Sequence, residues 1–113
     1  MNIEHITNNF AVAPQITAAD VASLASSGYQ LIICNRPDGE SPEQPAFADI
    51  DAKAEELGIR TVYIPFTAQS LSVDHVERFK SVYETDQKTL AYCRSGNRCK
   101  MLFEASQRII SGA

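Results

Sequence analysis

The chain has 113 residues, of which 44% are hydrophobic and 21% charged, a mixture that suits one globular domain (1–113) and disfavours disorder. A formal net charge of −4 disfavours a general nucleic-acid-binding protein, which carries a strong basic bias. No run approaches the ~20 apolar residues that span a bilayer, and the start of the chain lacks the basic and apolar segments of a signal peptide. The three cysteines predict reduced thiols and a cytoplasmic location, because a domain of this size needs no disulfide.

The first half of the chain alternates between strand and helix patterns. Residues 10–13 predict a strand, and Thr17 followed by Asp20 three residues later predicts the start of a helix. Residues 29–34 form a compact apolar run, typical of a strand covered on both faces. Residues 35–45 are dense in turn-forming residues and predict a loop.

The second half continues the same alternation. The pattern predicts helices over 47–57, 72–85 and 98–110, with strands over 60–66 and 89–92. Strands that alternate with helices indicate an α/β fold, with a mainly parallel central sheet and helices on both faces.

The topology also predicts where a ligand binds. In open sheets of this kind, ligands lie beyond the carboxyl ends of the strands. Three predicted loops leave those ends, at 35–45, 67–71 and 93–98. We therefore expect the functional site where these three loops converge.

The segment after the last predicted strand carries the residues for cysteine chemistry. Cys93 follows that strand directly, and Gly96 lets the chain turn so that backbone N–H groups point inward. These amides and the positive end of the helix near Arg98 form a cradle for an anion. A thiolate held in such a cradle has a pKa of about 3.5 to 7.5, against ~8.5 for a free thiol, and the amides also stabilise an anionic group in transfer. Cys93 is the predicted nucleophile, and Arg98 is predicted to contact the anion.

The neighbouring residues have both functional and structural interpretations. A buried core cysteine is the alternative for Cys93, but a core cysteine gains nothing from two arginines and a glycine turn. Arg36 either reaches the site or pairs with a local acid in its turn-rich loop. The predicted anion-binding residues are Arg94, Ser95, Gly96, Asn97 and Arg36, with Arg94 expected to point outward.

The other cysteines and the histidines predict no cofactor. Cys34 ends an apolar strand and is expected in the core. Cys99, six residues after Cys93, is either a resolving thiol or a small residue that packs in the helix. His5 and His75 show no ligand spacing, so neither a metal nor another cofactor is predicted.

The motif Cys-Arg-Ser-Gly-Asn-Arg at 93–98 resembles the active-site loop of rhodanese-type sulfurtransferases. With Phe10, Gln15 and Asn-Arg-Pro-Asp-Gly-Glu at 35–40, the chain resembles a small bacterial domain of the beta-lactamase hydrolase-like proteins. That domain occurs alone or fused to a metallo-β-lactamase-like domain. The resemblance implies the fold of protein tyrosine and dual-specificity phosphatases, and both sulfur-transfer and phosphatase roles are attached to the domain. Family members often continue beyond the point reached at 111–113, which leaves a further element open.

Two features favour sulfur transfer over phosphate chemistry. The phosphatase pattern is His-Cys, five residues and then Arg, whereas here Tyr92 precedes Cys93. Only four residues separate Cys93 from Arg98, and Cys99 stands where the phosphatase arginine would fall. A loop with one amide fewer makes a tighter cradle, better suited to a persulfide sulfur than to a phosphate. A phosphatase also needs a general acid for the leaving oxygen, and the loop 67–71 contains no acid.

The sequence therefore predicts a sulfurtransferase that carries sulfane sulfur as a Cys93 persulfide, from a small anionic donor to an acceptor thiol. The first alternative is a cysteine-dependent phosphatase that forms a cysteinyl-phosphate from a phosphate ester, with Asp38 as the attractive general acid. The second is a thiol redox-sensing module in which Cys93 and Cys99 form a disulfide. No membrane or nucleic-acid partner is expected, and the oligomeric state stays open.

Overall fold

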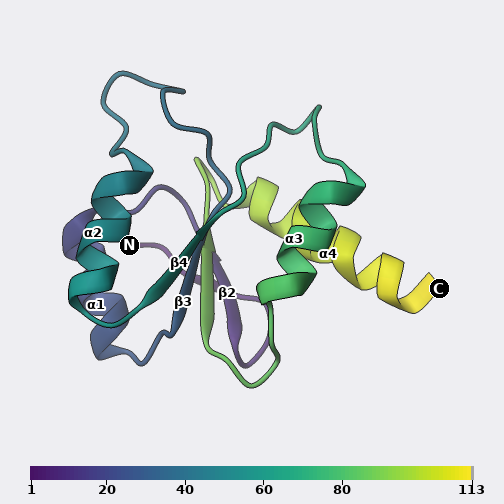
Figure 1. The fold of residues 1–113 in the computed structure, drawn as a ribbon, viewed down its shortest axis with the longest axis horizontal. Coiled ribbons are helices and arrows are strands. Elements are labelled where there is room, and N and C mark those ends of the chain that lie inside the picture. The colour runs from purple at the N-terminus through teal and green to yellow at the C-terminus, as the bar shows by residue number, and fades with distance from the viewer. Residues whose placement is uncertain (113) are drawn as a thin grey trace.

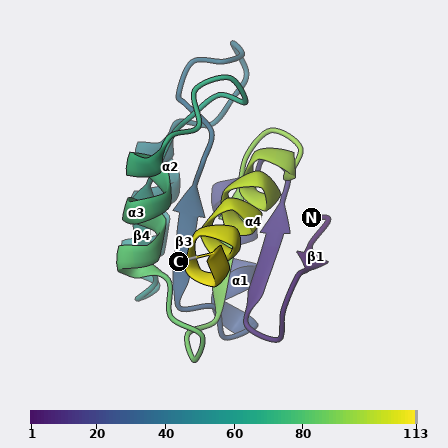
Figure 2. The same cartoon turned by 90° about the vertical axis from the view of Figure 1, so that its right-hand side faces the viewer.

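The structure, a computed structural model, describes residues 1–112, with the side chains of residues 1–108. A central sheet has the strand order β1-β2-β5-β3-β4 (Figure 1). Its strands are β1 (Glu4–His5), β2 (Phe10–Ala13), β3 (Leu31–Cys34), β4 (Arg60–Tyr63) and β5 (Thr89–Tyr92). Strands β2, β5, β3 and β4 run parallel, and β1 pairs antiparallel with β2 at the edge (Figure 2). The predicted mainly parallel sheet is confirmed.

Helices cover both faces of this sheet, as predicted. They are α1 (Ala18–Ser26), α2 (Phe47–Glu56), α3 (Val73–Val82) and α4 (Asn97–Gly112). Helices α1 and α2 lie on one face, and α3 and α4 on the other (Figure 1). Strand residues alternate between the two faces, because successive side chains of a strand point to opposite sides. On β3 and β5, the side chains packed with α1 and α2 are Ile32, Cys34, Leu90 and Tyr92. Those packed with α3 and α4 include Leu31, Ile33 and Ala91, and Cys93 continues this set beyond β5.

Local hydrogen bonds explain where some helices begin and end. The N–H of Thr17 donates to Asp20 Oδ2 at 2.9 Å, and the N–H of Asp20 donates to Thr17 Oγ1 at 3.3 Å, so the predicted capping box starts α1. Helix α3 ends at Val82, three residues before the predicted end. The carbonyl of Thr85 instead accepts a hydrogen bond from Asn9 Nδ2 at 2.6 Å, which ties this segment to the turn before β2.

The carboxyl ends of the parallel strands meet at Asn35, which directly follows β3 and is fully buried. Its N–H donates to the carbonyl of Tyr92 and its Nδ2 donates to the carbonyl of Ile64, both at 2.9 Å. Its own carbonyl accepts the N–H of Phe66 at 3.3 Å. The ends of β5, β3 and β4 are thereby joined at the edge where the site was expected. Within residues 1–112, no helix is both long and apolar enough to cross a membrane.

Candidate active site

Cys93 lies immediately after β5 with its side chain fully buried. Its N–H donates to the carbonyl of Ala13 at 3.3 Å, which fixes the nucleophile to the end of β2. The N–H of Gly96 donates to Cys93 Sγ at 3.0 Å. Gly96 has a φ of +93°, a conformation that L side chains rarely adopt, and a Cβ there would meet the Ala13 carbonyl group at 3.6 Å. The predicted glycine turn therefore aims an amide at the sulfur.

The surroundings of Cys93 lower its pKa from an ordinary 9.0 to about 5. The largest cause is a hydrogen bond from the Cys99 thiol, and the backbone amides of Cys99, Ser95 and Arg98 add to it. Burial opposes these contacts, because a charged sulfur loses hydration, and it does not outweigh them. Cys93 is therefore a thiolate at neutral pH, as the predicted cradle requires.

The other two thiols remain protonated at neutral pH. Burial raises the pKa of Cys34 to about 11, and its thiol donates to the carbonyl of Arg36 at 3.3 Å. Burial also raises the pKa of Cys99 well above its ordinary value, and the neighbouring Cys93 adds to this rise. Cys93 is therefore the thiol that can act as a nucleophile, while Cys99 serves as its hydrogen-bond donor.

Arg98 forms a two-point ion pair with Glu40. The distances Nη1–Oε2 and Nη2–Oε1 are both 2.7 Å, and Nη1 also donates to the carbonyl of Phe66 at 3.1 Å. Glu40 belongs to the loop after β3 and Phe66 to the segment after β4, so Arg98 joins the predicted loop 35–45 to the last residue of the predicted strand 60–66, directly before the predicted loop 67–71. Glu40 was not among the predicted site residues. It ends the Asn-Arg-Pro-Asp-Gly-Glu segment that carries the family resemblance, but nothing in that segment specifies a contact with Arg98.

The geometry of Arg98 leaves donors free for an anion. A guanidinium has five N–H donors. Its Nη1–Nη2 edge faces Glu40, so the edge formed by Nε and Nη2 is not used by the carboxylate. The Glu40 hydrogen bond is the largest cause that raises the pKa of Arg98, and Cys93 adds to the rise through its charge and a hydrogen bond. The charge of Arg98 therefore interacts with both the Glu40 carboxylate and the Cys93 thiolate.

Arg36 lies behind this ion pair and is buried. Its Nε donates to Glu40 Oε1 and its Nη1 donates to Gln15 Oε1, both at 3.0 Å. Of its two predicted roles, pairing with a local acid is therefore the one observed. Glu40 is thus shared between two arginines, and the Arg98 hydrogen bond is the largest cause that lowers its pKa.

The remaining predicted residues of the loop contribute mainly backbone. The side chains of Arg94, Ser95 and Asn97 are exposed, and Gly96 is buried. Arg94 points outward, as expected, while its carbonyl accepts the N–H of Gln15 at 3.4 Å. The cradle around Cys93 is therefore built from amides, and Arg98 supplies its guanidinium.

Asp38, the predicted general acid, has a structural contact. Its Oδ1 accepts the N–H of Phe47 at 2.9 Å, at the start of α2, where Ala46 has no capping side chain. Its own N–H donates to the hydroxyl of Tyr63 at 2.9 Å. Asp38 therefore caps α2 in this structure, and its role as a proton donor stays a prediction.

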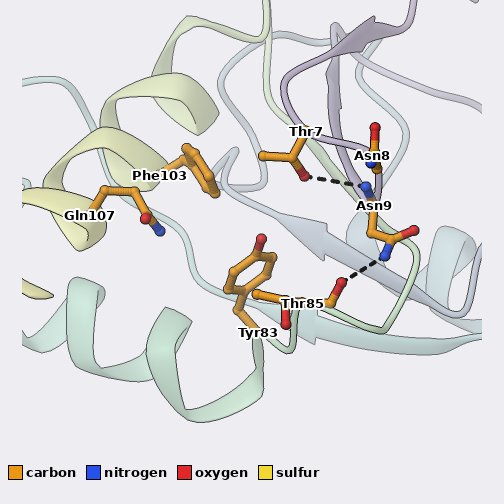
Figure 3. Close-up of a pocket in the computed structure, with 7 residues that line it drawn as sticks. All are labelled: Thr7, Asn8, Asn9, Tyr83, Thr85, Phe103 and Gln107. Carbon is orange, nitrogen blue, oxygen red and sulfur yellow. Dashed lines mark hydrogen bonds between the residues drawn. The ribbon is translucent and has the colours of Figure 1, made fainter.

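A cavity of about 340 Å³ lies beside the start of β2, and its lining residues are drawn in Figure 3. Because β2 and β5 run parallel, it lies at the opposite end of the sheet from Cys93, which follows β5. It is lined by Thr7, Asn8, Asn9, Tyr83, Thr85, Phe103 and Gln107. This lining contains neither a charged residue nor a cysteine, so the cavity is separate from the thiolate site. Among the described residues, there is no group of three or more His, Cys, Asp or Glu side chains that could hold a metal ion.

A family model described as "Beta-lactamase hydrolase-like protein, phosphatase-like domain" matches residues 2–110. The chain belongs to this family. A beta-lactamase hydrolase-like protein of Xylella fastidiosa is 31% identical over 110 residues, and one of Agrobacterium fabrum is 29% identical over 104 residues. These matches cover 96% and 91% of the chain but 26% and 24% of the relatives, so the chain spans about a quarter of their length.

Solved structures agree with this family. A putative phosphatase of Neisseria meningitidis is 37% identical, with a TM-score of 0.82 over 91% of this chain and 74% of that one. A putative phosphatase of Shewanella putrefaciens has the same TM-score at 19% identity, over 97% and 69% of the two chains, and shows the fold alone. The implied protein tyrosine phosphatase-like fold is confirmed, and these matches contradict the sulfurtransferase prediction, which was wrong.

The error came from equating the arginine spacing with the size of the cradle. Arg98 does lie one residue closer to Cys93 than in the phosphatase pattern. However, the amide of Cys99 also stabilises the Cys93 thiolate, together with those of Ser95 and Arg98. The one-residue difference in spacing places the arginine at a different position, but it does not shorten the backbone, which still supplies amides as far as Cys99. The short spacing therefore does not favour a persulfide.

Proposed function

We propose that the chain is a cysteine-dependent phosphatase that hydrolyses phosphate monoesters through a cysteinyl-phosphate on Cys93. The observation that carries this proposal is the Cys93 thiolate, which lies against inward-facing amides with Arg98 beside it. The family match supports the reaction class. We propose residues 1–113 as one catalytic unit.

In the first step, the Cys93 thiolate attacks phosphorus, a P–S bond forms, and the P–O bond to the leaving group breaks. The loop amides and the free edge of Arg98 donate hydrogen bonds to the non-bridging oxygens. These donors are oriented before the substrate arrives, so they need little reorganisation in the transition state. The leaving oxygen takes a proton from a donor or from water.

In the second step, water attacks phosphorus and the P–S bond breaks. The electron pair returns to Cys93 as a thiolate, and the proton of the water passes to the released inorganic phosphate. The Cys99 thiol, which hydrogen-bonds to the sulfur of Cys93, stabilises the thiolate as it leaves. The low pKa of Cys93 therefore serves both steps, because the sulfur must be a thiolate to attack and a good leaving group afterwards.

Aryl phosphates are the first substrates to test. One structural neighbour, TpbA of Pseudomonas aeruginosa, was solved with phosphotyrosine, although at 14% identity it supports only the fold here. The experiment measures p-nitrophenyl phosphate hydrolysis and looks for a phosphoryl adduct by intact-mass analysis after acid quench. Cys93→Ser should abolish both, and Cys34→Ser should retain both as the matched cysteine control. Turnover in Cys93→Ser equal to the parent contradicts the proposal.

A further inference from the structure

We infer that Glu40 is a positioning residue, which acts through Arg98 and holds the arginine's free edge toward the oxyanion. This inference rests on the proposed phosphatase function. It concerns an acidic side chain inside an anion-binding site, where simple electrostatics makes a carboxylate unfavourable. The presence of Glu40 therefore needs a geometric reason.

The contacts of Glu40 provide that reason. Both of its oxygens bind Arg98 at 2.7 Å, and Oε1 also accepts from Arg36 Nε at 3.0 Å. A two-point pair between a guanidinium and a carboxylate fixes the plane of the guanidinium as well as its position. The Phe66 carbonyl supplies a third contact to Arg98 at 3.1 Å. An arginine held at three points cannot turn its remaining edge away from the substrate.

Glu40 is itself held in place by Arg36, on the side away from Arg98 in the chain of contacts. Arg36 is buried, and its Nη1 is fixed by Gln15 Oε1 at 3.0 Å, while the N–H of Gln15 binds the carbonyl of Arg94 in the catalytic loop. These contacts form a closed path from the Cys93 loop through Gln15, Arg36 and Glu40 to Arg98. The carboxylate is thereby anchored relative to the amides that it serves.

The charges of this group still favour an anion. Without the Cys93 thiolate, as in the Cys93→Ser variant, two arginines and one carboxylate leave a net charge of +1, so Glu40 removes half of the positive charge that the arginines bring. Its pKa is lowered, chiefly by the Arg98 hydrogen bond, and it therefore remains ionised and cannot act as the general acid. The negative charge of Glu40 weakens anion binding, whereas its positioning of Arg98 strengthens it. Because the two effects have opposite signs, a binding measurement can separate them.

The test measures binding of inorganic phosphate by calorimetry in the Cys93→Ser background, where no covalent adduct forms. If charge alone matters, Glu40→Gln strengthens phosphate binding. If Glu40 positions Arg98, the same change weakens binding by about tenfold, because a charge-assisted contact is misaligned. Glu43→Gln is the matched control: it removes one negative charge from the same loop, outside the Arg98–Glu40–Arg36 contacts, and should change affinity less than about twofold. Equal or tighter binding in Glu40→Gln overturns the inference.

Glu40→Asp covers the case in which loss of charge beside buried Arg36 prevents folding. This variant keeps the carboxylate but is too short to reach both arginines in the same geometry, so phosphate binding should again weaken. Parent-like affinity in a folded Glu40→Asp protein overturns the inference. In the active background, Glu40→Gln and Arg98→Lys should be non-additive in kcat/KM, since Glu40 acts through Arg98, and additive losses contradict it.

The binding and turnover measurements separate the two proposals. Weakened phosphate binding in Glu40→Gln, with no turnover of any aryl phosphate by the parent, supports the positioning role and contradicts the phosphatase. Turnover by the parent, with unchanged phosphate binding in Glu40→Gln, supports the phosphatase and contradicts the positioning role.

Discussion

The thiol of Cys99 donates a hydrogen bond to the sulfur of Cys93, and this contact is the largest cause of the low Cys93 pKa. A thiol is a weak donor. It is effective here because Cys99 is fully buried and its own pKa is raised, so the proton stays on its sulfur. The two cysteines therefore differ in protonation state at neutral pH, with Cys93 a thiolate and Cys99 a thiol.

The first prediction concerns the pH dependence of Cys93 alkylation. The iodoacetamide reaction at Cys93 should have its midpoint near pH 5, the pKa of the thiolate. Cys99→Ala should raise this midpoint, because it removes the largest stabilising contact, whereas Cys34→Ser should leave it in place. A midpoint near that of a free thiol in the parent would contradict the predicted cradle.

The same pKa shift links Cys93 to stability. Its pKa in the folded protein, about 5, lies below the ordinary value of 9.0, so the unfolded chain binds more protons between these values. The contribution of Cys93 is fully present above pH 9.0, declines as the pH falls and is lost below about pH 5. Denaturant unfolding of the parent and of Cys93→Ser should diverge as the pH rises through this window. A stability difference between the parent and Cys93→Ser that stays constant across this pH window would contradict the low pKa of Cys93.

The second prediction concerns Gly96. Gly96→Ala forces an L side chain to a φ of +93°, which costs about 1–3 kcal/mol of stability. It should also reduce turnover, because the Gly96 amide that donates to Cys93 at 3.0 Å is displaced. Thermal unfolding and p-nitrophenyl phosphate kinetics measure the two effects. Gly58→Ala, a positive-φ position outside the site, controls for backbone strain, since it should lower stability without the same loss of turnover.

The sequence predicted those parts of the fold that depend on local pattern. Residues 10–13 and 89–92 were predicted as strands and are β2 and β5, since each is a compact run that is buried throughout. Residues 4–5 were missed, because β1 consists of two exposed polar residues and exists only through pairing with β2. The Cys93 loop was located because its motif and its strand-to-helix position agree.

Features of the site that depend on distant contacts were not predicted. Glu40 and Arg98 are 58 residues apart in sequence, and neither residue type specifies the other as its partner. The sulfur-transfer prediction relied on the position of Arg98, which is one residue closer to Cys93 than in the phosphatase pattern. Loop size is set by the backbone, which a spacing between side chains describes only indirectly.

The third prediction concerns Asp38 and its two possible roles. If Asp38 only caps α2, Asp38→Ala should cost about 1 kcal/mol of stability, and Asp38→Asn should cost less because it keeps an acceptor for the Phe47 N–H. Neither change should alter the ratio of turnover between phenyl phosphate and p-nitrophenyl phosphate. A proton donor matters more for the poorer leaving group. A selective loss on phenyl phosphate in Asp38→Asn would instead assign Asp38 as the general acid.

The fourth prediction concerns oxidation of the Cys93–Cys99 pair. Hydrogen peroxide converts the Cys93 thiolate to a sulfenic acid and releases hydroxide. Cys99 then gives its proton to the sulfenic hydroxyl and its sulfur attacks that of Cys93, so that a disulfide forms and water leaves. Because the Cys99 side chain stabilises the Cys93 thiolate through a hydrogen bond, we expect this disulfide in the parent protein. Mild peroxide should remove two free thiols per chain, and the linked peptide should be found by mass spectrometry.

Cys99→Ser tests this prediction without removing the hydrogen bond, because a hydroxyl also donates to the Cys93 sulfur. In this variant Cys93 should lose its thiol singly and proceed to the irreversible sulfinic acid, so a reductant should fail to restore activity. The parent should recover activity with dithiothreitol, because a thiolate of low pKa is a good leaving group in exchange. Cys34→Ser should behave as the parent, since Cys34 takes no part in the disulfide. A parent protein that loses one thiol, or one whose disulfide joins Cys93 to Cys34, contradicts the assignment of Cys99 as the resolving thiol.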